Sequence, residues 1–180
     1  MNLNKEYIQD VIDQTLRVSG IAPGLDELNI EVVARGLARE QRFGNRLPKG
    51  CDYSVAEHSI VLSRHGDPKF AMFKLLHDAT EFLFRDIPGP IKALMPQYKE
   101  VETAAFPIIL KAIGSPVEAH EKGDYKIWDN RLCVFEAFSL FKTAGVPKHI
   151  RKHFPKLKLE RMKVEEATEA FLKRYEELKK

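Results

Sequence analysis

The sequence has few of the features that mark disulfide-bonded, membrane-spanning or strongly charged proteins. Its two cysteines, Cys51 and Cys133, lie far apart in no CxxC pattern, which is typical of reduced thiols rather than a disulfide framework or a zinc cluster. No apolar run approaches the roughly 20 residues of a membrane span, and the polar N-terminus lacks a signal-peptide core. The net charge of +3 is too small to indicate a nucleic-acid-binding protein. We therefore expect a soluble, cytoplasmic protein with neither a membrane nor a nucleic-acid partner.

The length and composition predict one compact domain. The 180 residues are 44% hydrophobic and 31% charged, which is ordinary for a globular protein with a sizeable core. We expect residues 1–180 to form a single domain with a core over about 30–145. A basic amphipathic helix is expected over about 156–180.

The spacing of apolar residues predicts an all-α helical bundle. Apolar side chains recur at three- and four-residue steps, and Gly and Pro punctuate the intervals between these segments. Asn29 and Ser54 are expected N-caps, and Glu57 completes a capping box with Ser54. Residues 14–18 could alternatively form a strand, and residues 43–52 are expected to be a loop. Helices are expected over residues 4–17, 29–39, 54–65, 69–84, 91–95, 98–113 (kinked at Pro107), 125–143 and 156–180.

The C-terminal segment is more basic than the rest of the chain. Residues 148–180 hold eleven Lys and Arg against six Asp and Glu. Apolar residues at steps of three and four predict an amphipathic helix that packs at the edge of the domain. The alternative is a tail that binds nucleic acid or another partner. The apolar positions are Val164, Ala167, Phe171, Tyr175 and Leu178.

The strongest chemical signal is His77-Asp78 inside an apolar segment. Burying a charged carboxylate costs on the order of several kcal/mol unless it is paired or bound to a metal. Glu81 follows one turn later, so on a helix all three side chains would share one face. Two carboxylates and an imidazole together favour a site for a divalent cation.

One helix cannot complete a coordination sphere, so other segments must contribute ligands. His58 lies in the apolar segment after Ser54, and Asp129 lies in Tyr125-Lys126-Ile127-Trp128-Asp129. With His77 and Asp78 they would supply two nitrogens and two carboxylates, leaving open positions for water and substrate. Taken singly, His58 could be a hydrogen-bonded core histidine, and Asp129 an N-cap or a buried ion-pair partner.

Four short segments in order resemble the HD-domain phosphohydrolase superfamily, in particular its small nucleotidase branch. That branch includes bacterial 5′-deoxynucleotidases and phage deoxyadenosine triphosphate triphosphohydrolases. Arg42-Phe43-Gly44 upstream also resembles an element of the branch, and the resemblance covers roughly residues 30–140. The family fold is an all-α bundle. The four segments are residues 53–59, 76–81, 86–92 and 126–129.

The resemblance implies a role for each matching residue. His58, His77, Asp78 and Asp129 would hold one divalent ion, which could be Mn, Co, Ni, Zn, Fe or Mg. Glu81 would be a general acid or base, with a role in orienting a ligand as the alternative. The remaining residues would contact the substrate: Asp86 at the deoxyribose, Arg42 at the phosphate, Phe43 near the sugar or base, and Lys92 and Lys126 along the phosphate chain. Arg39 or Arg46 could take the place of Arg42. Either lysine could instead simply face solvent.

The resemblance implies a metal-dependent phosphohydrolase of 5′-nucleotides, in which metal-activated water attacks phosphorus. We favour a 5′-deoxynucleotidase. The alternatives are a deoxynucleoside triphosphate triphosphohydrolase that releases triphosphate, and a non-catalytic module that binds nucleotide or metal. By analogy the protein could form a homo-oligomer, and it would act in the host cytoplasm if a phage encodes it.

Overall fold

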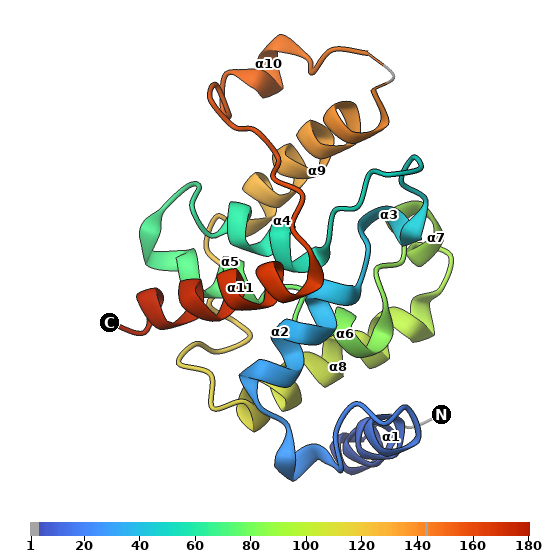
Figure 1. Cartoon of the computed structure of the whole chain (residues 1–180). Coiled ribbons are helices and arrows are strands. Elements are labelled where there is room, and N and C mark those ends of the chain that lie inside the picture. The colour runs from blue at the N-terminus through green and yellow to red at the C-terminus, as the bar shows by residue number, and fades with distance from the viewer. Residues whose placement is uncertain (1–3, 143) are drawn as a thin grey trace.

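The computed structural model describes residues 4–142 and 144–180, and over these residues it contains helices and one isolated bridge, between Gln41 and Ser54, but no strand. The predicted all-α fold is therefore confirmed (Figure 1). In chain order, the elements are α1 (Lys5–Val18), η1 (Leu25–Glu27), α2 (Ile30–Arg39), α3 (Arg42–Asn45), α4 (Val55–Leu62), η2 (Pro68–Phe70), α5 (Ala71–Leu76), α6 (Glu81–Phe84), α7 (Gly89–Lys92), α8 (Pro96–Ala112), α9 (Tyr125–Phe141), α10 (Lys148–Arg151) and α11 (Val164–Leu178).

Two predicted helix starts have the expected capping geometry. The Asn29 side chain accepts a hydrogen bond from the Val32 N–H at the start of α2. Ser54 accepts from the Glu57 N–H, and the Glu57 carboxylate accepts from the Ser54 N–H, which completes the predicted capping box of α4. The alternative of a strand over residues 14–18 is wrong, because these residues form the end of α1.

The C-terminal helix α11 packs across α2 and α4 (Figure 1). Ala167, Phe171 and Tyr175 are buried in the same core as the apolar side chains of α1, α2 and α4. The predicted packing face is confirmed. Gly36 lets α6 approach α2 closely, because a Cβ at this position would lie 2.6 Å from Phe82 Cβ.

Phe171 is fully buried, and its truncation should destabilise the fold. We expect Phe171→Ala to lower the free energy of unfolding by about 3–5 kcal/mol, because it removes a buried aromatic ring and leaves a cavity. Urea denaturation followed by circular dichroism would measure the loss. Lys173→Ala on the exposed face of α11 is the control and should change stability by less than about 0.5 kcal/mol. Equal effects of the two substitutions would contradict this packing.

The start of the C-terminal helix was predicted wrongly. The helix begins at Val164 rather than near residue 156. Tertiary hydrogen bonds hold the preceding segment out of a helix, since the Met162 N–H donates to Glu57 Oε1 and the Arg161 guanidinium donates to the Gly50 carbonyl.

Other boundaries differ by a few residues. Helix α4 ends at Leu62 rather than near His65, and α7 begins at Gly89 rather than Ile91. Helix α9 ends at Phe141, and the predicted end at Thr143 lies outside the described residues. Helix α8 continues past Pro107.

The expected loop over residues 43–52 begins with one short helical turn, α3. Its backbone is not regular, because Phe43 and Gly44 have φ values of 60° and 61°. These left-handed residues turn the chain sharply directly after Arg42. The rest of the segment is irregular, as expected.

The prediction of one continuous helix over residues 69–84 is wrong. Helix α5 ends at Leu76, four residues in turn conformation follow, and α6 begins at Glu81. The Lys74 carbonyl lies 2.8 Å from His77 Nδ1 rather than accepting the next helical N–H, and Ala79 N–H donates to the Leu76 carbonyl in a tighter turn. The break therefore places His77 and Asp78 in a turn rather than on one helical face.

None of the helices in the described part of the chain has the length and apolar character needed to cross a membrane.

Candidate metal centre and substrate cleft

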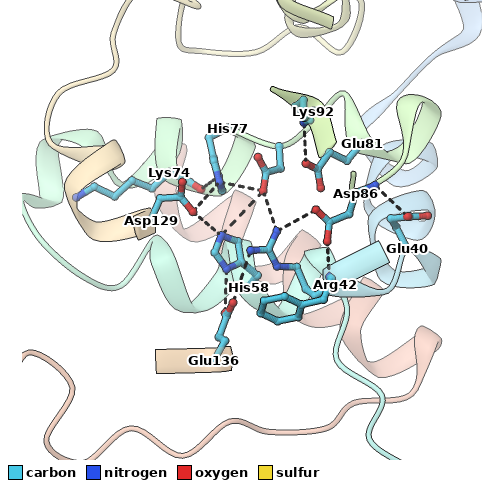
Figure 2. A network of polar contacts seen from close by, with 12 residues as sticks. Glu40, Arg42, His58, Lys74, His77, Glu81, Asp86, Lys92, Asp129 and Glu136 are labelled. Atoms are coloured by element: carbon cyan, nitrogen blue, oxygen red, sulfur yellow. Dashed lines mark hydrogen bonds and ion pairs between the residues drawn. The ribbon is translucent and has the colours of Figure 1, made fainter. Parts of the chain in front are cut away.

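His58 lies on α4 at the centre of the polar network and is fully buried (Figure 2). Its Nδ1 lies 2.9 Å from Glu136 Oε1. Because an ionised carboxylate only accepts hydrogen bonds, Nδ1 carries the proton and donates. The second ring nitrogen, Nε2, is therefore the one that could bind a metal, and this buried atom has no hydrogen-bond partner.

His77 has the same arrangement in the turn after α5. Its Nδ1 donates to the Lys74 carbonyl at 2.8 Å, and its buried Nε2 has no hydrogen-bond partner. The two imidazole rings lie 5.4 Å apart between centroids. In both rings Nδ1 is engaged by a hydrogen bond and Nε2 faces carboxylate oxygens, which is the arrangement in which histidines bind a metal through Nε2.

Asp129 completes a three-residue cluster from the first turns of α9. Its Oδ1 lies 3.3 Å from His58 Nε2 and 3.9 Å from His77 Nε2. One ligand atom from each of the three residues lies within 4.8 Å of the others. Three of the four predicted ligands thus form a group that could hold a metal ion.

Asp78, the fourth predicted ligand, lies beside this cluster. Its Oδ2 is 3.0 Å from His77 Nε2 and 4.0 Å from His58 Nε2. The same oxygen is 3.8 Å from Arg42 Nη1, so Asp78 also faces a buried cation. The tertiary structure therefore brings all four predicted ligands together, although they come from three separate segments.

The charges of the site favour a positive group between the carboxylates. Burial and the Arg42 charge oppose protonation of His58, but Glu136 and Asp129 outweigh them and raise its pKa to about 9. Burial also opposes ionisation of Asp78 and Asp129, yet the neighbouring imidazoles hold the pKa of both carboxyl groups well below its ordinary value. A divalent cation suits this excess of negative charge.

Glu81 lies beside the cluster at the start of α6. It is buried, its Oε2 has no hydrogen-bond partner, and its Oε1 is 3.8 Å from Lys92 Nζ. Burial first, and then the carboxylates of Asp78 and Asp86, raise its pKa well above the ordinary value. Glu81 is thus placed to hold a proton close to the candidate metal ligands.

Arg42, Phe43 and Asp86 lie behind the cluster rather than on the cleft described below. Arg42 is only 7% exposed, and its guanidinium is 3.5 Å from Asp86 Oδ1. Asp86 Oδ2 accepts a hydrogen bond from the Phe43 N–H at 2.6 Å, and the Asp86 N–H donates to Glu40. Asp86 lines a separate hollow of about 310 Å³. The structure does not bring these three predicted substrate contacts to the cleft.

An open cleft of about 930 Å³ begins at the candidate metal ligands. Lys92 and Lys126, both predicted substrate contacts, line it. In the structure Lys92 pairs with Glu102 at 2.9 Å, and Lys126 pairs with Asp129 at 2.8 Å. Lys99, Lys122 and His120 also line the cleft, and the sequence argument did not select them.

Glu136 is the most important site residue that the sequence argument missed. It lies seven positions after Asp129, on the same face of α9, between Phe135 and Ala137. An acid in an apolar helical segment is the signal that identified Asp78 and Asp129, and it applied here as well.

Comparisons with known proteins do not assign a function. No family model matches the chain. An uncharacterized protein of Escherichia coli K12, YfdR, is 37% identical over 91 residues, which cover 51% of this chain and 50% of YfdR. An uncharacterized protein of Rhodobacter capsulatus is 32% identical over 84 residues, covering 43% of each chain. The chain thus matches about half the length, or slightly less, of these curated relatives.

Proposed function

We propose that the protein is a metal-dependent phosphohydrolase of 5′-nucleotides, most simply a 5′-deoxynucleotidase. The observation that carries this proposal is the pair of unpartnered Nε2 atoms of His58 and His77 facing Asp129, at one end of a cleft lined by lysines. The resemblance of the motif order to HD-domain nucleotidases supports the same conclusion. Such nucleotides belong to the cytoplasm, where we place the reaction.

The residues present fit a divalent cation. His58, His77 and Asp129 would hold it, with Asp78 as the fourth ligand. When bound, such an ion would polarise a phosphoryl oxygen and lower the pKa of a water molecule. The Nδ1–H bonds to Glu136 and Lys74 keep both imidazoles in the tautomer that this requires.

The chain itself supplies phosphate binding and proton transfer. Lys92 and Lys126 reach the cleft next to the candidate ligands and would neutralise phosphate oxygens. In the reaction water adds to phosphorus, the bond from phosphorus to the 5′ oxygen breaks, and that oxygen takes a proton. Glu81, buried and one turn beyond Asp78, would hold that proton.

A second activity is favoured by the number of cations in the cleft. A monophosphate needs one or two lysines, whereas Lys92, Lys99, Lys122 and Lys126 all line the same cleft. Four cations around one cleft fit a triphosphate, whose negative charge extends further than that of a monophosphate. The alternative product pair is therefore a deoxynucleoside and intact triphosphate.

Product analysis by chromatography would test both activities. The metal-stripped protein would be incubated with Mn²⁺ or Co²⁺ and separately with deoxyadenosine monophosphate and triphosphate. Deoxynucleoside from the monophosphate is the expected result. Deoxynucleoside and triphosphate from the triphosphate alone would favour the second activity. No product from either substrate, with metal and nucleotide still bound, would overturn the enzyme proposal in favour of a binding module.

A further inference from the structure

We propose that Glu136 is a positioning residue that fixes the tautomer and ring rotation of His58 for metal binding. The inference rests on the metal site of the proposed function but not on its reaction, so it can be tested without any substrate. Glu136 would act through His58 and would itself touch neither metal nor substrate.

Glu136 is buried and bonded directly to His58. The residue is fully buried on α9, where an isolated carboxylate would be costly. Its Oε1 accepts the Nδ1–H of His58 at 2.9 Å, across 78 positions of sequence. This bond turns the ring so that Nε2 points toward Asp129 Oδ1, 3.3 Å away. One helix thus supplies both a candidate ligand and the group that orients a second ligand.

Arg42 keeps Glu136 in place. Its Nη2 lies 3.7 Å from Glu136 Oε2, and its Nη1 lies 3.5 Å from Asp86 and 3.8 Å from Asp78. The Arg42 backbone is itself held, because its N–H donates to the Tyr53 carbonyl. A guanidinium surrounded by three carboxylates and absent from the cleft lining serves this network rather than the substrate.

The arrangement makes a specific demand on the side chain at position 136. It must accept a hydrogen bond from Nδ1–H at the length of a glutamate. Glutamine keeps this acceptor and loses the charge, whereas methionine keeps the shape and loses the acceptor. A purely structural role in packing would be satisfied by either side chain.

Metal binding to the metal-free full chain, measured by calorimetry and by the visible absorption spectrum of bound Co²⁺, would test the proposal. We expect Glu136→Met to weaken Co²⁺ binding about 10–100-fold, the usual loss when the partner of a ligating histidine is removed. The Co²⁺ spectrum should also change, because His58 is no longer held as a ligand. Glu136→Gln should retain the wild-type spectrum and most of the affinity.

Leu140→Ala is the matched control. Leu140 is buried on the same helix, but it packs with Cys51 and Tyr53 rather than with His58. It should lower stability and leave Co²⁺ affinity unchanged. If Glu136→Met does not fold, Glu136→Asp replaces it, since the shorter carboxylate cannot span to Nδ1 and should also weaken binding.

Wild-type affinity and spectrum in Glu136→Met, or in Glu136→Asp where that replaces it, would overturn the positioning role, as would equal losses in Glu136→Gln. Failure of the wild-type chain to bind Co²⁺ would overturn the metal site together with this inference. Metal binding with the expected variant pattern but no hydrolysis would overturn only the proposed reaction.

Discussion

Asp129→Ala is expected to abolish tight metal binding and to reduce hydrolysis to background. Asp129 Oδ1 is the one carboxylate oxygen of the cluster that lies within 4 Å of both Nε2 atoms without also facing Arg42. Removing the hydrogen-bond partner of a metal ligand lowers metal affinity about 10–100-fold, so removing the ligand itself should lower it at least about 100-fold. Calorimetric titration with Mn²⁺ or Co²⁺ would measure the affinity, and product formation would measure the activity.

The fold should survive this substitution. Asp129 lines the cleft, and its main partner apart from the histidines is the exposed Lys126 side chain. Circular dichroism should therefore remain that of the wild type. Asn130→Ala, at the next and exposed position of α9, is the control and should bind metal normally. Undiminished metal binding by Asp129→Ala would rule out the proposed ligand set.

Glu81→Gln is expected to lower the hydrolysis rate by about 10²–10⁴-fold while leaving metal affinity nearly unchanged, because it removes a proton-transferring group and keeps its shape. Glu81 is buried, and its unpartnered Oε2 is available to a reacting group. Steady-state kinetics at saturating metal would show the loss in kcat rather than in metal affinity.

Glu102→Gln is the matched control for this experiment. Glu102 lines the cleft and pairs with Lys92, the lysine that Glu81 also faces, so the two carboxylates share one charged neighbour. It should reduce kcat far less than Glu81→Gln. An unchanged rate in Glu81→Gln would assign Glu81 to holding Lys92 rather than to catalysis.

The fold class could be derived from local sequence information. The apolar spacing of α1, α2 and α11 and the caps at Asn29 and Ser54 each depend on residues within one or two turns. Capping hydrogen bonds and the apolar face of a helix depend on residues close together in the sequence, so they can be predicted without the tertiary structure. Boundaries were less reliable where a distant residue competes for the backbone, as Glu57 does for the Met162 N–H.

The candidate ligands were also visible in the sequence, because ionisable residues in apolar helical segments need a physical reason. His77 and Asp78, and then His58 and Asp129, satisfied that criterion, and the tertiary structure brings all four together. The prediction that His77, Asp78 and Glu81 share one helical face was wrong, however, because His77 and Asp78 lie in a turn.

By itself, then, the sequence determined the all-α fold class, the caps at Asn29 and Ser54, and four ionisable residues of the candidate site, but not Glu136. Only the tertiary structure decided the orientation of those residues. It paired Glu136 with His58, enclosed Arg42 among three carboxylates, and placed Lys99 and Lys122 on the cleft. These contacts join residues far apart in the chain, and the direction of a side chain across such a distance depends on how the helices pack.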